Sequence, residues 1–240
     1  MSILAKGSSR PVKSSKVRLY GSRFDPYSAG IRYVMREKGL DYEDVYINTH
    51  DKPEWYEDIN PTGEIPCLEY GDEIVAETLV IYDYLEEKFP EIKTQQTEAY
   101  KRSRDKLFIA RCARFLTPKI TGCVANPQEN IQDVVKALSK VNEILGKRGT
   151  DYFGGSSPNY ADYYLWGWLE LLPVFKAVHN LTLDLDQQEY SHYFSWVFRM
   201  DKNAYVEKDR TERIVNFKIR VDFFKTMAAG KPDLTIGLEH

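Results

Sequence analysis

The sequence predicts an α/β domain followed by an all-helical domain, and three observations lead to this class. About 75 residues near the N-terminus show strand and helix patterns in the order β-α-β-β-β-α. A polar stretch without hydrophobic periodicity follows. Beyond that stretch the strand patterns end and long helical patterns take over. Few folds combine a parallel β-α-β unit, an antiparallel hairpin and a separate helical half.

The α/β domain is predicted to span residues 16–90. Its first helix starts at Pro26, because Asp25 can cap the first turn and proline suits the first helical position. Gly71 and Asp72 form a strong hairpin signal, and Pro90 stops the last helix. The predicted strands are 16–20, 41–48, 66–70 and 73–75, and the predicted helices are 26–38, 53–59 and 78–89.

The all-helical domain is predicted to span residues 100–229, after a linker at 91–99. Asn159 and Asp162 have the spacing of a capping box at the start of an aromatic helix. The helical patterns cover 100–124, 127–145, 160–178, 187–200 and 210–228.

The composition argues against several function classes. The 240 residues carry 33 basic and 36 acidic side chains, so a net charge of -3 offers no broad positive surface for nucleic acid or an anionic membrane. Cys67, Cys112 and Cys123 are odd in number and form no C-x-x-C pair, which argues against a disulfide framework and a structural zinc site. The histidines show no metal-binding spacing either, so we expect no metal.

Both chain ends are expected to lie outside the functional fold. Residues 1–15 lack the apolar centre of a secretory signal, and no run approaches the roughly 18 apolar residues of a membrane span. We therefore expect a flexible N-terminal extension on a cytoplasmic protein. Its basic, serine-rich composition also fits an organelle transit peptide, although its arginine content is low. Residues 238–240, Leu-Glu-His, resemble the scar of a cloning site and the start of a tag.

Several short motifs occur in one order along the chain, and together they resemble the omega class of cytosolic glutathione transferases. The resemblance covers about 210 residues, from Lys16 to near Lys225. It implies a thioredoxin-like N-terminal domain, an all-helical C-terminal domain, glutathione as co-substrate and a homodimer. The motifs are Arg23-Phe24-x-Pro26-Tyr27, Lys52-Pro53-Glu54-Trp55, Asn60-Pro61-x-Gly63-x-Ile65-Pro66, Glu77-Thr78 with Tyr84-Leu85, Phe153-Gly154-Gly155 and Ala161-Asp162-Tyr163.

The resemblance implies a glutathione site in the N-terminal domain. Pro66 is similar to the family's cis-proline, which would let the Ile65 backbone pair with the ligand as with an added strand. Glu77 and Thr78 would hold the γ-glutamyl group at a helix N-terminus. Taken alone, these residues are better explained as an edge-strand proline and a helix cap, and only the surrounding motifs favour a binding site.

Four further residues complete the implied binding site. Lys52 would pair with the glycyl carboxylate and Tyr27 would pack against the ligand, although a lysine is often only solvated and an aromatic residue is often core. Trp168 and Leu171 would line an apolar pocket for a hydrophobic second substrate between the domains. The omega pattern often has an arginine at the Leu171 position, so this pocket is expected to be more apolar.

The chain departs from the omega pattern at Asp25, the implied catalytic position, where that class has a nucleophilic cysteine. A carboxylate cannot form or resolve a mixed disulfide, so thiol transfer and dehydroascorbate reduction are expected to be weak or absent. An ionised Asp25 is also a poor base for a thiol and would oppose a thiolate beside it. Asp25 is equally well explained as an N-cap. The sulfur would then need another activating group, and the sequence does not rank the hydroxyls of Tyr20, Ser22, Tyr27 and Ser28.

These observations predict an omega-like glutathione transferase that conjugates glutathione to hydrophobic electrophiles, with roles in detoxification and oxidative stress. Two other functions remain open. A non-catalytic protein that binds glutathione or a hydrophobic ligand would keep the site and lack the chemistry at Asp25. A protein-interaction module would need no glutathione site. Glutathione binding separates the interaction module from the other two, and turnover separates the enzyme from the binding protein.

Overall fold

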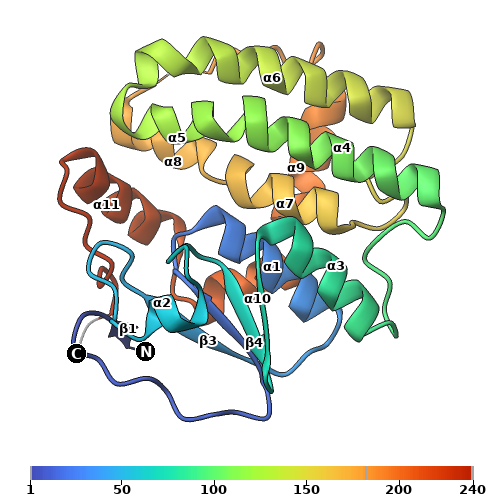
Figure 1. The fold of residues 1–240 in the computed structure, drawn as a ribbon. Coiled ribbons are helices and arrows are strands. Elements are labelled where there is room, and N and C mark those ends of the chain that lie inside the picture. The colour runs from blue at the N-terminus through green and yellow to red at the C-terminus, as the bar shows by residue number, and fades with distance from the viewer. Residues whose placement is uncertain (1, 182, 239–240) are drawn as a thin grey trace.

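The N-terminal domain is built on a five-stranded mixed sheet with the strand order β1-β3-β2-β4-β5 (Figure 1). This computed structural model describes residues 2–181 and 183–238. β2 (Val17–Gly21) pairs in parallel with β3 (Tyr42–Ile47) and antiparallel with β4 (Cys67–Tyr70). β4 pairs antiparallel with β5 (Glu73–Ala76). The four strands that the sequence predicted are thus present, and their pairing is that of a thioredoxin-like domain.

The fifth strand lies in the segment for which we expected a flexible extension. β1 (Ile3–Leu4) pairs in parallel with β3 at the edge of the sheet. The Gly7 N–H donates to Glu54, and the Trp55 indole donates to the Ser8 carbonyl. A strand of two residues has too few positions to show alternation, and its partners are some 45 residues away. The expectation of an unstructured extension over 1–15 is therefore corrected for this segment.

Three helices accompany the sheet: α1 (Pro26–Glu37), α2 (Tyr56–Ile59) and α3 (Thr78–Lys88). α1 buries Ile31, Val34 and Met35, which recur at helical spacing. Figure 1 shows α1 and α3 between the sheet and the helical domain. This arrangement brings the N-termini of both helices to the boundary between the two domains.

The helical domain differs from its predicted pattern at three breaks. The predicted helix 100–124 divides at Leu116, and 160–178 divides near Leu171. Pro118 and Pro173 lie in the first turn after these breaks, where a missing N–H is tolerated that would interrupt a continuous helix. The helices are α4 (Ala99–Phe115), α5 (Thr117–Ala125), α6 (Pro127–Arg148), α7 (Tyr160–Leu169), α8 (Leu172–His179), α9 (Ser191–Asp201), α10 (Ala204–Glu212) and α11 (Phe217–Ala228).

The third break separates α10 from α11, within the predicted helix 210–228. Ile214 adopts a φ of 56°, a left-handed conformation that a β-branched residue seldom takes and that ends the helical path. The Val215 N–H still donates to the Arg210 carbonyl, which closes the end of α10. The chain therefore changes direction before α11. The predicted tag remnant falls partly on Glu239 and His240, which lie outside the described residues.

The predicted capping box at the start of α7 is present. Asn159 accepts from the Ala161 N–H at 2.9 Å, and Asp162 accepts from the Asn159 N–H at 2.9 Å. Asp162 also accepts from the Phe153 N–H and from the Trp196 indole. α7 is buried along its whole length and packs on α1, so this network positions the helix through which the helical domain contacts the N-terminal domain.

None of the helices in the described part of the chain is long and apolar enough to cross a bilayer.

Candidate functional site

A cleft of about 260 Å³ opens between the two domains. The N-terminal domain contributes Tyr27, Ile65, Pro66, Glu77 and Thr78 to its walls. These five residues come from the start of α1, the loop before β4 and the start of α3. The structure therefore brings together five of the nine predicted site residues.

The opposite wall comes from the helical domain and was not predicted. It consists of Ile109 and Ala113 on α4 and Tyr164 on α7. Tyr164 lies in a run of aromatic and apolar residues in which every position is buried. Periodicity cannot identify the face of such a helix that meets a ligand, because no polar face exists for comparison. The sequence held no signal for this wall.

The loop that carries Ile65 and Pro66 is held in place by side chains behind it. The peptide bond between these residues is cis, as the resemblance implied. The Glu64 carbonyl accepts from the Tyr56 hydroxyl and from the Asn60 side-chain amide, both at 2.8 Å. β4 pairs with β2 only from Cys67 onward, and within the described residues no backbone hydrogen bond involves Ile65. The Ile65 N–H and carbonyl are thus positioned beyond the ladder, where an extended peptide can pair with them.

The start of α3 presents backbone N–H groups to the same cleft. Glu77 is the N-cap residue, and its side chain makes no capping hydrogen bond. The N–H groups of the first helical turn have no acceptor within the helix and suit a carboxylate. Glu77 has φ 69° and ψ 120°, a conformation that favours glycine. Residues other than glycine keep such a backbone mainly where function requires it, which strengthens the assignment of this turn to a binding site.

Lys52 lies beside this cleft and does not line it. Its Nζ donates to the Gly63 carbonyl at 3.3 Å, on the loop that leads to Ile65. A Cβ at Gly63 would lie 2.2 Å from Nζ, so the glycine makes room for the lysine. Lys52 can therefore reach the mouth of the site only by leaving this carbonyl.

Asp25 caps α1. One of its carboxylate oxygens accepts from the Ser28 N–H at 2.6 Å and from the Ser28 hydroxyl at 2.5 Å. Burial raises the pKa of Asp25 above its ordinary value, and the hydrogen bonds from Ser28 oppose that rise. Burial is the larger of these two effects on the pKa of Asp25. Asp25 lines a separate void of only about 10 Å³, together with Leu171.

Trp168 and Leu171 lie outside the larger cleft. Trp168 is buried on α7, and its ring meets the Tyr27 ring edge-on with the centroids 4.9 Å apart. Leu171 is buried at the start of α8, against the small void beside Asp25. In this structure Trp168 therefore supports a cleft residue, and no apolar pocket opens at Leu171.

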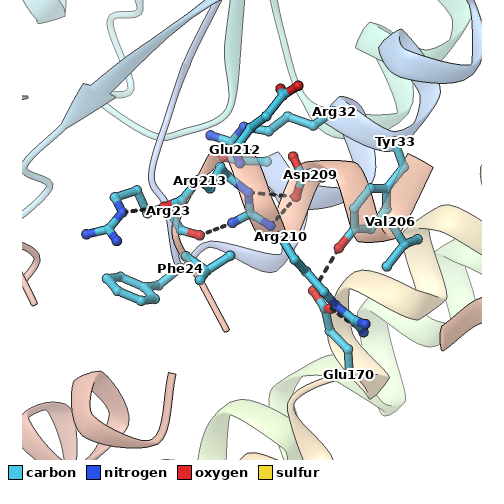
Figure 2. Close-up of polar contacts among 12 residues, drawn as sticks. Arg23, Phe24, Arg32, Tyr33, Glu170, Val206, Asp209, Arg210, Glu212 and Arg213 are labelled. Carbon is cyan, nitrogen blue, oxygen red and sulfur yellow. Dashed lines mark hydrogen bonds and ion pairs between the residues drawn. The ribbon is translucent and has the colours of Figure 1, made fainter. Parts of the chain in front are cut away.

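A buried network of charges lies behind the site and joins the two domains (Figure 2). The Tyr33 hydroxyl on α1 donates to Glu170 at 2.8 Å, and Arg220 on α11 pairs with the same carboxylate at 2.8 Å. Arg23 donates to the Arg213 carbonyl at 3.0 Å, and Arg213 donates back to the Arg23 carbonyl and pairs with Asp209. These contacts connect the β2–α1 segment to α10 and to the chain that follows it.

A second and larger cleft, of about 850 Å³, lies between α4 and α6. Its apolar surface includes Leu107 and Phe115, which are 40% and 62% exposed. Among the described residues, no acid lines it. Its six cationic side chains are Lys101, Arg104, Arg111, Lys140, Lys147 and Arg148.

The structure offers no alternative thiol nucleophile or metal centre in its described residues. All three cysteines are free and buried. Burial raises the pKa of Cys67 to about 12, and the pKa of Cys112 likewise to about 12, so neither forms a thiolate near neutral pH. The described residues contain no cluster of His, Cys, Asp and Glu that could hold a metal ion.

Two family models match the chain. The model described as "Glutathione S-transferase, N-terminal domain" matches residues 19–93, and "Glutathione S-transferase, C-terminal domain" matches residues 127–197. The first region contains the cis bond and the start of α3, and the second contains the capping box of α7.

Known proteins resemble the chain in sequence and in fold. It is 30% identical to pyrimidodiazepine synthase of Drosophila melanogaster, over 97% of this chain and 96% of that protein. It is 33% identical to human glutathione S-transferase omega-2, over 72% of this chain and 74% of that protein. The solved structure of rice GST1 in complex with glutathione superposes with a TM-score of 0.77 at 19% identity, covering 91% of this chain and 99% of that one.

Proposed function

Because the chain belongs to the glutathione transferase family, with omega-class transferases among its relatives, we propose that it binds glutathione in the 260 Å³ cleft and conjugates it to hydrophobic electrophiles. One observation carries this proposal. The unpaired backbone of Ile65 and the uncapped N-terminus of α3 face one cleft from two sides. A small anionic peptide needs both features, an edge to pair with and N–H groups for a carboxylate.

The proposed binding mode follows from these two features. The cysteinyl part of glutathione pairs with the Ile65 N–H and carbonyl. Its γ-glutamyl carboxylate accepts from the Thr78 N–H and hydroxyl, and Glu77 meets its amino group. Lys52 leaves the Gly63 carbonyl to pair with the glycyl carboxylate. The electrophile lies on the helical side of the cleft, against apolar Ile109.

In the proposed reaction, the glutathione sulfur attacks an electrophilic carbon and the leaving group departs. Disulfide chemistry through Asp25 is weak or absent, because the carboxylate has no sulfur to exchange and accepts both donors of Ser28. Cytoplasmic detoxification and protection from oxidative stress are the proposed roles of this activity. A non-catalytic role in binding glutathione or a hydrophobic ligand is the alternative, and the use of Asp25 as a cap favours it.

Calorimetry and turnover together test the proposed function. Glutathione should bind, and Thr78→Val should weaken binding by roughly tenfold, because it removes a hydroxyl donor to a carboxylate. Thr121→Val is the matched control, since Thr121 is exposed on α5 and lies outside the cleft lining. Conjugation of an alkyl or aryl halide should be measurable above the uncatalysed rate. Binding without turnover would establish the alternative, and no binding at all would refute the site.

We also propose that the protein is a homodimer that uses the cleft between α4 and α6. A second copy is the proposed occupant, because the exposed Leu107 and Phe115 need cover and the basic rim suits the exposed acids Glu87 and Glu91. Light scattering should give twice the chain mass of 27.9 kDa. Leu107→Glu should yield monomers, whereas an unchanged dimer in that variant would move the interface elsewhere.

A further inference from the structure

We infer that the N-terminal arm, residues 3–15, holds Lys52 in place for the glycyl carboxylate of glutathione, with Gly7 and Trp55 as the positioning residues. This inference rests on the proposed function. It identifies what fixes the backbone around Lys52, whose side chain lies beside the cleft. The arm then sets the affinity for one charged group of the ligand and leaves the rest of the site unchanged.

Lys52 lies on a segment with little secondary structure of its own. Between the end of β3 at Ile47 and the start of β4 at Cys67, a stretch that the structure describes throughout, α2 is the only helix or strand. Lys52 precedes α2, and its Nζ donates to the Gly63 carbonyl. Backbone that neither a helix nor a strand fixes loses conformational freedom when it binds a ligand, which costs affinity. Contacts from another segment reduce that cost when they order the backbone beforehand.

The arm forms hydrogen bonds on both sides of Lys52, from three consecutive residues. These bonds join the Lys6 N–H to the Asp51 carbonyl at 3.0 Å, the Gly7 N–H to the Glu54 carboxylate at 3.0 Å and the Trp55 indole to the Ser8 carbonyl at 2.7 Å. Asp51 directly precedes Lys52, and Glu54 follows it by two residues. The main chain of Lys52 is therefore held from both sides, while its side chain can still leave the Gly63 carbonyl.

The arm presents these groups from a tight turn that requires glycine. The Ser8 N–H donates to the Ala5 carbonyl at 2.9 Å, and the Ala5 N–H donates to the Ser8 hydroxyl at 3.0 Å. Gly7 in this turn has a φ of 79°, in the left-handed region. A β-branched residue at Gly7 would strain the turn, even though no atom lies within 4 Å of an added Cβ. Gly7 therefore determines how the turn meets the Lys52 segment.

Further contacts fix the rest of the arm to the sheet. Residues 2–16 include no acid, and the arm's polar side chains meet acids on the strands. Arg10 pairs with Glu69 on β4 at 2.9 Å, and the Ser14 hydroxyl donates to Glu43 on β3 at 2.7 Å. At its other end the arm pairs with β3 through β1. Because both ends of the arm are held, a change in its turn alters the contacts with the Lys52 segment.

A ligand that lacks one charge tests this inference. Glutathione esterified at its glycyl carboxylate keeps the γ-glutamyl and cysteinyl groups and offers no charge for Lys52. In calorimetry the parent should bind glutathione roughly fivefold more tightly than this ester, the share expected of one partly exposed ion pair. Gly7→Val and Trp55→Phe should each reduce that preference to less than about twofold. They should do so by weakening glutathione binding, while the Kd for the ester stays within about twofold of the parent value.

Gly230→Val is the matched control. Gly230 follows α11 with a φ of 72° and has no atom within 4 Å of an added Cβ, so valine strains the backbone there as it does at Gly7. Its variant should lose a similar free energy of unfolding in denaturant and keep the parent's preference for glutathione.

Three results would contradict the inference. A full preference for glutathione in folded Gly7→Val and Trp55→Phe would overturn the role of the arm and leave the proposed function intact. A parent that binds glutathione and the ester equally would overturn the contact between Lys52 and the glycyl carboxylate, and the inference with it. A parent that binds neither ligand would overturn the proposed function as well.

Discussion

The carboxylate of Asp25 accepts both donors that Ser28 offers, and this geometry limits what the position can do. One oxygen serves the N–H and the hydroxyl of the same residue, as in an ordinary N-cap. Burial raises the pKa of the carboxyl and so disfavours a second charge near a thiolate. A helix N-terminus with a proline after the cap is nevertheless the kind of position that activates a cysteine.

Asp25→Cys should therefore restore thiol chemistry to this position. Glutathione-dependent disulfide reduction should rise about tenfold or more, because a thiol at a helix N-terminus has a lowered pKa. Loss of the carboxylate cap should lower the free energy of unfolding by about 0.5–2 kcal/mol. Asp25→Ser is the control, since it retains a capping hydroxyl without sulfur. Equal reductase rates in the two variants would contradict the prediction.

A second residue-scale prediction concerns Glu37, near the end of α1. Burial raises the pKa of Glu37 to about 7, and its Oε2 has no hydrogen-bond partner within the described residues. The folded protein therefore binds this proton more tightly than the unfolded chain does, and stability falls as pH rises from about 4.5 to 7. Glu37→Gln should be more stable than the parent at pH values above 7, by about 1–2 kcal/mol. Denaturant titrations of the parent and Glu37→Gln at pH values from about 4.5 to above 7 measure this difference in stability. Glu87→Gln is the control, because Glu87 is exposed. Parallel curves for parent and Glu37→Gln would refute it.

At the scale of elements, the capping box is a feature that sequence spacing alone predicted correctly. Asn159 and Asp162 are three residues apart, so their pairing depends only on local helix geometry. The cleft wall formed by the loop before β4 and the start of α3 was likewise predictable from short motifs. The helix breaks just before Pro118 and Pro173 were not predicted, because apolar periodicity continues across them.

The hydrogen bonds of Asp162 should contribute strongly to stability at the N-terminal end of α7. Asp162 is fully buried and accepts hydrogen bonds from three backbone N–H groups and the Trp196 indole. Asp162→Ala should lower the free energy of unfolding by about 3 kcal/mol or more, because several buried donors lose their acceptor. Asp151→Ala is the control, because it removes an exposed acid of the adjoining loop. It should change the free energy of unfolding by less than about 0.5 kcal/mol. Chemical denaturation compares them, and similar losses in both variants would refute the assigned role.

At the scale of the whole molecule, the contacts between the two domains could not be predicted from the sequence. Arg23 and Arg213 are 190 residues apart, and Tyr33 and Glu170 are 137 apart. No periodicity relates residues at such separations, and buried charges contradict the usual expectation that charged residues lie outside. The same reason explains why Tyr164 escaped prediction as a cleft residue. Its importance arises only when α7 packs on α1.

Glu170 is the acid on which this interface depends. Burial opposes its ionisation, but Arg220 and Arg210 outweigh burial and lower the pKa of Glu170. Glu170→Gln should lower the free energy of unfolding by about 3–5 kcal/mol, because the buried Arg220 loses its counter-charge and Arg210 loses one of its two acid partners. Asp201→Asn is the control, since it removes the half-exposed partner of Arg210 and should cost less than about 1 kcal/mol. Equal thermal melting points for the two variants would contradict this role.

The four carbonyls that Arg23 binds also set an order of events during synthesis. Its guanidinium donates to the Arg213, Ile214, Leu234 and Ile236 carbonyls. Those residues are translated long after residues 16–90 have left the ribosome. Until they arrive, a guanidinium that is fully enclosed in the native protein lacks its acceptors. The N-terminal domain therefore reaches its final packing only when the chain has been made as far as Ile236, and a nascent chain that stops at α10 carries an unfinished N-terminal domain.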